Sequence, residues 1–404
     1  MIPLEDARRV VLSACGRLEP VSVPLADALG AVTAGPVATS DDVPPFANSA
    51  MDGYAVCADD TRWASEERPA RLRVVATVAA GSAPDRAVSP GEAVRIMTGA
   101  PMPEGADAIA IVEVTSPDGD HVLVRQPAQR GQHIRHPGGD IRSGQLVFPA
   151  GTALGPGHLG VLASLGWEKV TVYRRPRVAV LSTGDELVEG STPLRPGQIR
   201  DTNRLTLLSL CRRSGFEVLD LGVARDDEDE IRTAIRRGVT EADALISSGG
   251  VSMGDFDYVK KVLDELGEMA WMQVAIRPAK PLAFGTVDGV PVFGLPGNPV
   301  SSMVSFELFA RPALRQMMGF AGPLLDRTRV PAVADEAIER RSDGKVHFAR
   351  VLVEPGGDGR FHVRPSGGQE SHLLRAMALA NALAVVPDGP GVAAGGEVEL
   401  LLLD

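Results

Sequence analysis

The chain has 404 residues, which exceeds the usual size of one hydrophobic core and predicts two to four domains. Hydrophobic residues make up 44% and charged residues 23%, values typical of a globular protein. The net charge of −11 argues against nucleic acid as the main partner, because that binding depends on basic residues that neutralise phosphates.

The cysteines and the N-terminus indicate the compartment. Cys15, Cys57 and Cys211 are far apart and have no CxxC spacing, which argues against a zinc site or a disulfide framework. The first residues carry acids early and lack the pattern of a signal peptide. No apolar run approaches the roughly 20 residues of a membrane span. We therefore expect a cytoplasmic protein with no membrane partner.

The first half of the chain predicts a helix over 4–15, a loop over 41–49 and then β structure. Short apolar runs between about 70 and 154 are separated by Gly/Pro turns, which predicts a small β-rich module. A short helix is expected over 157–166. The literal GxGxxG pattern at 155–160 follows no long buried strand, so we do not expect a dinucleotide site there.

From residue 176 strands alternate with helices, which predicts a doubly wound, largely parallel sheet. Asp201 or Thr202 could cap a helix that begins at Asn203, and Gly215 would end it. Further helices are expected over 226–239, 258–267 and 301–318. The region after about 322 returns to short β runs.

Two loops of this α/β region carry the strongest functional signal. The segments SSGGVSMGDFD (247–257) and GLPGNPVSS (294–302) each follow an apolar strand-like run. Strands that open into such loops place backbone N–H groups and hydroxyls at one sheet edge, where anions bind. Two tight structural turns are the alternative.

Acidic and basic side chains follow the same predicted strands. Glu186, Asp226 and Asp257 would make the edge suitable for Mg²⁺, although helix caps are the alternative for the first two. Arg277 and Lys280 could neutralise an anion there. His347 and His372 could face a ligand from the last domain, but a lone histidine is more often structural.

Eight motifs together resemble the molybdopterin molybdenumtransferase (MoeA) family, which includes the C-terminal part of gephyrin. The resemblance covers residues 4–404. The motifs are PPFANSAMDGYAV (44–56), RIMTGAPMPEGADAI (95–109), GQHIRHPGGDI (131–141), STGDEL (182–187), DTNR with RDD (201–204, 225–227), SSGGVSMGDFDYV (247–259), RPAKP (277–281) and GLPGNPVSS (294–302).

The resemblance implies a multidomain fold of α/β plus β type. A central doubly wound, largely parallel α/β domain of molybdopterin-binding type would be flanked by small β-rich domains. The expected domains are an N-terminal helical and linker domain (1–45 and 144–175), a small β-rich domain (46–143), the α/β domain (176–322) and a C-terminal β-barrel-like domain (323–404).

The resemblance also implies the reaction, which is Mg²⁺-dependent insertion of molybdate into adenylylated molybdopterin with release of AMP. The active site would be shared between the subunits of a homodimer. The alternatives are a non-catalytic pterin-binding scaffold and a molybdopterin adenylyltransferase.

The family's functional residues are carried over by motif. The catalytic residues would be Asp52, Thr98, Asp140, Glu186, Asp226, Asp257 and Lys280. Of these, Glu186, Asp226 and Asp257 would hold Mg²⁺. The substrate-binding residues would be Gly249, Gly250, Ser252, Arg277, Gly294, Pro296, Gly297, Asn298, Pro299, Ser301, Arg350 and Ser371. Without the resemblance, the Asp-Gly turn at Asp52 would be interpreted as structural. Because the family usually has lysine where this chain has Arg277, we assign catalysis to Lys280 and substrate binding to Arg277.

Overall fold

The structure, a computed structural model, describes residues 1–250 and 258–403. The chain forms two compact units. The first unit contains Met1–Ala34, Gly151–Gly155 and Lys169–Asp404, and the second contains Gly35–Ala150 and Pro156–Glu168. Each unit is described by itself below. The division into four domains stays a prediction.

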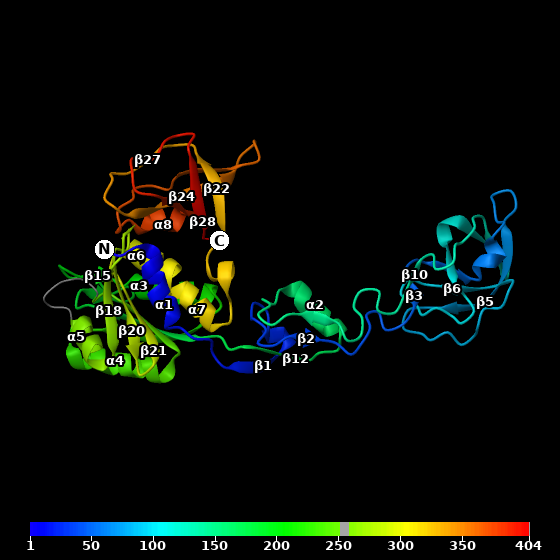
Figure 1. The fold of residues 1–404 in the computed structure, drawn as a ribbon, viewed down its shortest axis with the longest axis horizontal. Coiled ribbons are helices and arrows are strands. Elements are labelled where there is room, and N and C mark those ends of the chain that lie inside the picture. Colours follow the sequence, from blue (N-terminus) through cyan, green and yellow to red (C-terminus); the bar gives the residue numbers. More distant parts are fainter. Residues whose placement is uncertain (251–257, 404) are drawn as a thin grey trace. The chain divides into compact units, whose positions relative to one another are not determined.

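A six-stranded sheet forms the centre of the first unit (Figure 1). Its strand order is β16 (Glu217–Ala224), β13 (Arg177–Thr183), β17 (Ala244–Ser248), β21 (Val290–Leu295), β20 (Pro281–Val287) and β18 (Glu268–Gln273). The first four strands pair in parallel, and β20 pairs antiparallel with both of its neighbours. The α/β sheet predicted from the alternation is confirmed, with an antiparallel hairpin added on one side.

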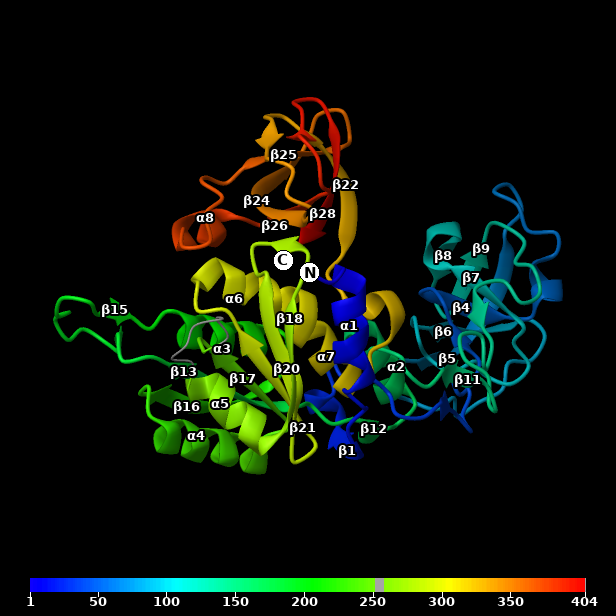
Figure 2. The ribbon, with the colours of Figure 1, turned by 60° about the vertical axis from the view of Figure 1, so that its left-hand side comes forward.

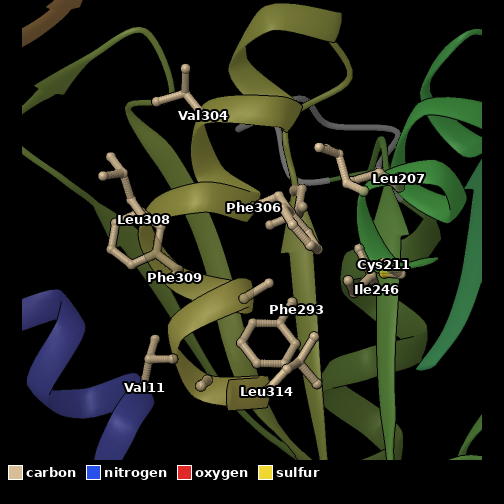
Figure 3. Packing of buried hydrophobic residues seen from close by; sticks show 14 of the residues in the cluster. Val11, Leu207, Cys211, Ile246, Phe293, Val304, Phe306, Leu308, Phe309 and Leu314 are labelled. Carbon is tan, nitrogen blue, oxygen red and sulfur yellow. The ribbon is translucent and has the colours of Figure 1, made fainter. Parts of the chain in front are cut away.

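Helices cover both faces of this sheet because successive side chains of a strand point to opposite faces. Val180 and Ile246 pack with α3 (Asn203–Arg213) and the helix that follows β21, whereas Leu181 and Leu245 pack with α4 (Glu228–Glu241) and α5 (Tyr258–Leu266). Figure 3 shows the first of these cores, where aromatic side chains gather against the sheet. The arrangement is doubly wound.

The helix starts show how the loops at the sheet edge are fixed. The Asp227 side chain accepts hydrogen bonds from the backbone N–H groups of Asp229 and Glu230, so it caps α4. Before α3, the Asp201 carboxylate accepts from Arg204 N at 3.2 Å, while Thr202 makes no side-chain cap bond. Of the two predicted caps of α3, Asp201 is therefore the one that bonds.

The predicted helix over 301–318 is one run with an irregular middle. It consists of α6 (Pro299–Ser305), the π-helical η4 (Phe306–Ala310) and α7 (Arg311–Met317). Pro312 has no N–H to donate to the carbonyl of Leu308. Arg8, from α1 (Leu4–Ser13), donates to that oxygen at 2.6 Å instead. The N-terminal helix thus satisfies a buried carbonyl that the proline leaves open.

The C-terminal part of the first unit is a small barrel (Figure 2). It contains β22 (Arg329–Ala334), β24 (Val346–Pro355), β25 (Phe361–Pro365), β26 (Ala382–Val386) and β28 (Glu397–Leu402). The pairings run β24–β25–β22–β28–β26, and β26 pairs back to β24, which closes the barrel. The strand β19 (Ile276–Arg277) joins β24 in parallel and so links the barrel to the loop before β20.

Short elements complete the first unit. They are the pairs β1 (Pro20–Pro24) with β12 (Lys169–Tyr173), β14 (Leu187–Val188) with β15 (Ile199–Arg200), and β23 (Ile338–Glu339) with β27 (Gly391–Val392), together with α8 (Leu374–Leu379), η1 (Leu25–Asp27) and η5 (Gly322–Leu325).

The second unit is built on another six-stranded sheet, as the β-rich pattern predicts. Its order is β7 (Ala108–Ile111), β4 (Gly53–Val56), β6 (Glu92–Ile96), β5 (Ala70–Val78), β9 (His121–Val124) and β8 (Thr115–Asp118). The remaining elements are β2 (Val37–Ala38) with β11 (Leu146–Phe148), β3 (Asn48–Ser49) with β10 (Ile134–Arg135), η2 (Ala58–Thr61), η3 (Val112–Val114) and α2 (Pro156–Ser164). A Cβ at Gly53 would clash with the Ala110 carbonyl, so only glycine allows β7 to approach β4 there.

Among the residues that the structure describes, no helix is long and apolar enough to cross a membrane.

Candidate functional site

Two glycine-rich loops of the first unit touch at one edge of the α/β sheet. They follow β17 and β21, whose C-terminal ends lie side by side because the strands are parallel. Gly249 N donates to Leu295 O at 3.1 Å, so the first loop is anchored to the end of the second strand. Gly249 and Gly250 have φ values of 95° and 68°, a region that favours glycine. The predicted residues Gly249, Gly250, Pro296, Gly297, Asn298 and Pro299 therefore gather at this edge, whereas Gly294 belongs to β21 itself and not to the loop.

Asn203 holds the two loops together. Its side-chain amide donates to Ser248 Oγ at 2.7 Å and to Gly297 O at 2.6 Å. Asn203 is the first residue of α3, so one side chain connects a helix start with both loops. Its motif was recognised in the sequence, but no role was assigned to this residue. An amide at the start of a predicted helix of the α/β region is the signal that could have identified it.

Carboxylates gather at the neighbouring strand ends. Asp226 N donates to Asp185 Oδ1 at 3.2 Å, and Asp185 N donates to Asp226 Oδ2 at 3.3 Å, which ties the loops after β13 and β16 together. The carboxylate of Glu186 folds over Gly184, where a Cβ would clash with it. Within 1–250 and 258–403, no three His, Cys, Asp or Glu side chains form a group that could hold a metal. Asp257 and Ser252 lie outside the described residues.

A cavity lined by arginines lies where the loop before β20 meets the barrel. We call it the arginine pocket. Its volume is about 480 Å³. The residues that line it are Arg277, Pro278, Ile338, Glu339, Arg340, Arg341, His347, Phe348, Ala349, Arg350, Gln369 and Val386. Four of these side chains are cationic and one is anionic, so the cavity is suited to an anion.

Arg350 is the most informative residue of the arginine pocket. It is fully buried, and only its Nη2 has partners, the carbonyls of Gly368 at 2.7 Å and Glu370 at 3.2 Å. Its Nε and Nη1 are buried without a hydrogen-bond partner. Burial lowers the pKa of Arg350 to about 10, so the side chain is still charged at neutral pH. Burying a cation with two unpaired donors costs free energy unless a ligand accepts hydrogen bonds from them.

Arg277 and Lys280 lie on either side of Pro278 and Ala279, and both are exposed. Within the described part of the chain, neither side chain makes a hydrogen bond or ion pair. The structure places Arg277 in the arginine pocket, next to β24. Lys280 is not among the residues that line the pocket, and it precedes β20.

Ser301 and Ser371 lie near the second glycine loop. Ser301 is a buried residue of α6, and Val300 N donates to Ser371 O at 3.2 Å. The segment that carries Ser371 also contributes Gln369, whose side chain bonds to the backbone N and O of Arg350. One short segment of the barrel therefore contacts both the second glycine loop and the arginine pocket.

The second unit brings together two of its three predicted site residues. The Asp52 carboxylate accepts from Thr98 N at 2.7 Å and from Thr98 Oγ1 at 2.8 Å. The backbone N–H of Thr98, then its hydroxyl and the charge of Arg95, lower the pKa of Asp52. Asp140 is exposed, and no contact connects its side chain to that pair among the described residues.

The first unit thus contains three features that could bind parts of a ligand. Backbone N–H groups of glycine loops bind phosphate, carboxylates suit a hard cation, and the arginine pocket suits a second, compact oxyanion.

Comparisons with known families cover almost the whole chain. Residues 2–166 match the MoeA N-terminal region (domain I and II), 179–316 a probable molybdopterin binding domain, and 334–403 the MoeA C-terminal region (domain IV).

Individual relatives agree. A molybdopterin molybdenumtransferase 2 of Mycobacterium tuberculosis is 39% identical over 407 residues, which cover 99% of each chain. The molybdopterin molybdenumtransferase of Bacillus subtilis is 33% identical and covers 100% of this chain and 94% of its own. A crystal structure of a molybdopterin biosynthesis MoeA protein from Pyrococcus horikoshii aligns over the full length of both chains with a TM-score of 0.84 and 30% identity.

Proposed function

The chain belongs to the molybdopterin molybdenumtransferase family, as its eight motifs predict, and we propose that it inserts molybdate into adenylylated molybdopterin with Mg²⁺-dependent release of AMP. It is a transferase of molybdenum cofactor biosynthesis. The adenylylated form of the substrate, the release of AMP and the roles of individual residues belong to the proposal.

The observation that carries the oxyanion half of the proposal is Arg350. Arg350 lines a cavity with net positive charge, and its Nε and Nη1 are buried donors without a partner, which the oxygens of a tetrahedral oxyanion would match. We assign molybdate to the arginine pocket, with Arg277 contributing charge at its exposed side. Lys280, Ser252, Ser301 and Ser371 would complete the molybdate side.

The phosphate half of the proposal depends on the two glycine loops. Gly250 can present its backbone N–H group without a Cβ between it and a ligand, while the N–H of Gly249 is bonded to Leu295 O and anchors the loop. The second segment, from Gly294 to Pro299, would form the other side of the pocket that holds the pterin phosphate. Asn203 sets the distance between the loops and is therefore a positioning residue in this proposal.

Glu186, Asp226 and Asp257 would hold Mg²⁺. The donor chemistry fits, because carboxylate oxygens are the ligands that Mg²⁺ prefers and the loops that carry Glu186 and Asp226 are tied together. When bound, Mg²⁺ would neutralise charge on the phosphoanhydride. The protein's own contribution there is to fix the carboxylates and to offset developing negative charge with Lys280 and loop N–H groups.

Asp52, Thr98 and Asp140 belong to the other compact unit. On the family resemblance we propose that the protein is a homodimer and that these residues complete the active site across the subunits. The hydrogen bonds from Thr98 lower the pKa of Asp52 and so favour its ionised form, which suits a residue that orients a cation or a donor of the substrate.

The test is molybdate-dependent release of AMP by the purified protein with adenylylated molybdopterin and Mg²⁺. We expect Asp257→Asn to reduce the rate at least about a hundredfold, because a neutral amide is a poor Mg²⁺ ligand. Asp288→Asn is the matched control, since Asp288 lies in the β20–β21 turn with a φ of 51° that asparagine also adopts.

Undiminished turnover by Asp257→Asn would remove Asp257 from the mechanism. AMP release that requires no molybdate would contradict the proposed reaction, and a dependence on ATP would favour an adenylyltransferase instead.

A further inference from the structure

We propose that His347 takes up a proton when a dianion enters the arginine pocket, so that oxyanion binding in this pocket is coupled to protonation. This inference rests on the proposed function, because it assigns a property to the same pocket. It concerns a residue that the family motifs do not assign.

His347 occupies a position from which it can respond to an anion. It lies on β24 directly opposite Arg277 of β19, and it is one of the residues that line the arginine pocket. Its side chain is 13% exposed, and its Nε2 is buried with no hydrogen-bond partner. The carboxylate of Asp343 is 3.8 Å from Nε2, which is too far for a hydrogen bond.

The surroundings of His347 oppose its protonated form as long as the pocket holds no anion. Burial, followed by the charges of Arg340 and Arg277, lowers the pKa of His347 to about 4. Asp343 acts in the opposite direction, but its carboxylate is shared with Arg340 at 2.7 Å and Lys345 at 2.9 Å. The imidazole is therefore neutral at physiological pH.

The other charged side chains that line the pocket are also cationic in excess. Arg341 and Arg350 add positive charge, and Glu339 adds one negative charge. The cationic excess that attracts an anion thus adds to burial, the larger effect, in disfavouring the protonated form of His347.

A bound dianion would reverse this balance. Its two negative charges would offset the arginines and offer oxygens to the unpartnered Nε2, and both effects raise the pKa of His347. Since the pKa is then higher in the complex than in the free protein, binding takes up a proton. The affinity for the dianion is greatest below the pKa that His347 has in the free protein. The additional affinity is lost progressively as the pH rises through the pKa that His347 has in the complex.

The same coupling distinguishes anions by charge. A monoanion of the same tetrahedral shape provides half the field at Nε2 and so raises the pKa of His347 less. We therefore expect the pocket to prefer dianions such as molybdate and sulfate over monoanions such as perchlorate, and the preference to increase as the pH falls.

The experiment is titration calorimetry of the full-length protein with sulfate, which remains a dianion without polymerising between pH 5 and 8. Heats measured in two buffers of different ionisation enthalpy give the number of protons taken up. For the wild type we expect uptake of up to one proton, and an affinity that increases about five- to tenfold from pH 7 to pH 5. Perchlorate should show weaker binding with less proton uptake.

His347→Asn removes the titrating ring but keeps a polar side chain. We expect it to lose the proton uptake and the increase of sulfate affinity from pH 7 to pH 5 that the wild type shows. His362→Asn is the control, because His362 belongs to the barrel but pairs with Asp335 and Asp358 outside the pocket. It should retain the wild-type proton uptake.

The outcomes separate the inference from the proposed function. Sulfate binding without proton uptake, or uptake that persists in His347→Asn, overturns the role of His347 and leaves the oxyanion pocket standing. Equal loss of affinity at every pH in His347→Asn shows a merely structural role and also overturns it. A wild-type protein that binds no sulfate overturns both the oxyanion pocket and the coupling.

Discussion

At the scale of single residues, the pair of Asp52 and Thr98 shows how one local contact stabilises the ionised form of a candidate catalytic group. Asp52 is the aspartate of the Asp-Gly turn and directly precedes β4, and Thr98 lies just after β6, the neighbour of β4 in the sheet. Because Thr98 donates through both its N–H and its hydroxyl, the carboxylate is stabilised although it is exposed to solvent. A lowered carboxyl pKa stabilises the folded state above the unfolded pKa, and this contribution is lost as the pH falls through the folded pKa.

We expect Thr98→Val to raise the pKa of Asp52 part of the way to its ordinary value. The substitution removes the hydroxyl donor but leaves the backbone N–H, which is the larger of the two contributions. A carboxyl-carbon NMR titration, with Asp52→Asn to assign the signal, measures the change. Thr98→Ser keeps the hydroxyl and should retain the wild-type pKa. An unchanged pKa in Thr98→Val would show that the hydroxyl bond is not made in solution.

At the scale of elements, the two glycine loops depend on α3 for their relative position. Asn203 is the first residue of that helix and donates to both loops, and Asp201 bonds to the helix start and to Ser182 of β13 at 3.0 Å. Glycine loops are conformationally permissive, so they need outside contacts to present their N–H groups in one arrangement. The start of α3 supplies those contacts.

Asn203→Asp should therefore impair the site more than the fold. The aspartate has the same shape, but it cannot donate and would place a carboxylate against the Gly297 carbonyl. We expect kcat/KM for the pterin substrate to fall at least about tenfold, with a destabilisation of about 1–3 kcal/mol. Steady-state kinetics and thermal unfolding measure the two effects.

Asn381→Asp is a matched control, since the Asn381 side chain also makes two hydrogen bonds, but within the barrel, to the backbone of Val353. It should lose stability by a similar amount and keep its kcat/KM. Equal kinetic loss in both variants would contradict a positioning role for Asn203.

At the scale of the whole molecule, the sequence predicts those helices, strands and loops that follow from local patterns of apolar and glycine residues. The helices and strands of the α/β sheet follow from apolar spacing, and the glycine loops follow from the residues that end β17 and β21. The family motifs then add site residues that no local rule identifies, and the catalytic and binding roles of those residues stay predictions.

Contacts between segments that are far apart in the chain could not be predicted from local sequence patterns. The proximity of Arg277 and His347 results from β19 joining β24, two segments far apart in the chain that no periodicity connects. The strand β22 contains Pro331, yet it pairs with β28 through residues far along the chain. The contact between Arg8 and Leu308 likewise exists only in the folded chain.

The two compact units each build their cores from their own described residues, so we expect them to unfold in separable steps. Ile96 is fully buried in the second unit, and Ile235 is fully buried in the first. Replacing either by alanine should cost about 2–5 kcal/mol in the affected unit alone. Calorimetry of the full-length protein should show Ile96→Ala lowering one transition by several degrees and Ile235→Ala lowering the other. If each substitution moves both transitions equally, the units unfold as one cooperative structure, and the separation of their cores has no thermodynamic consequence.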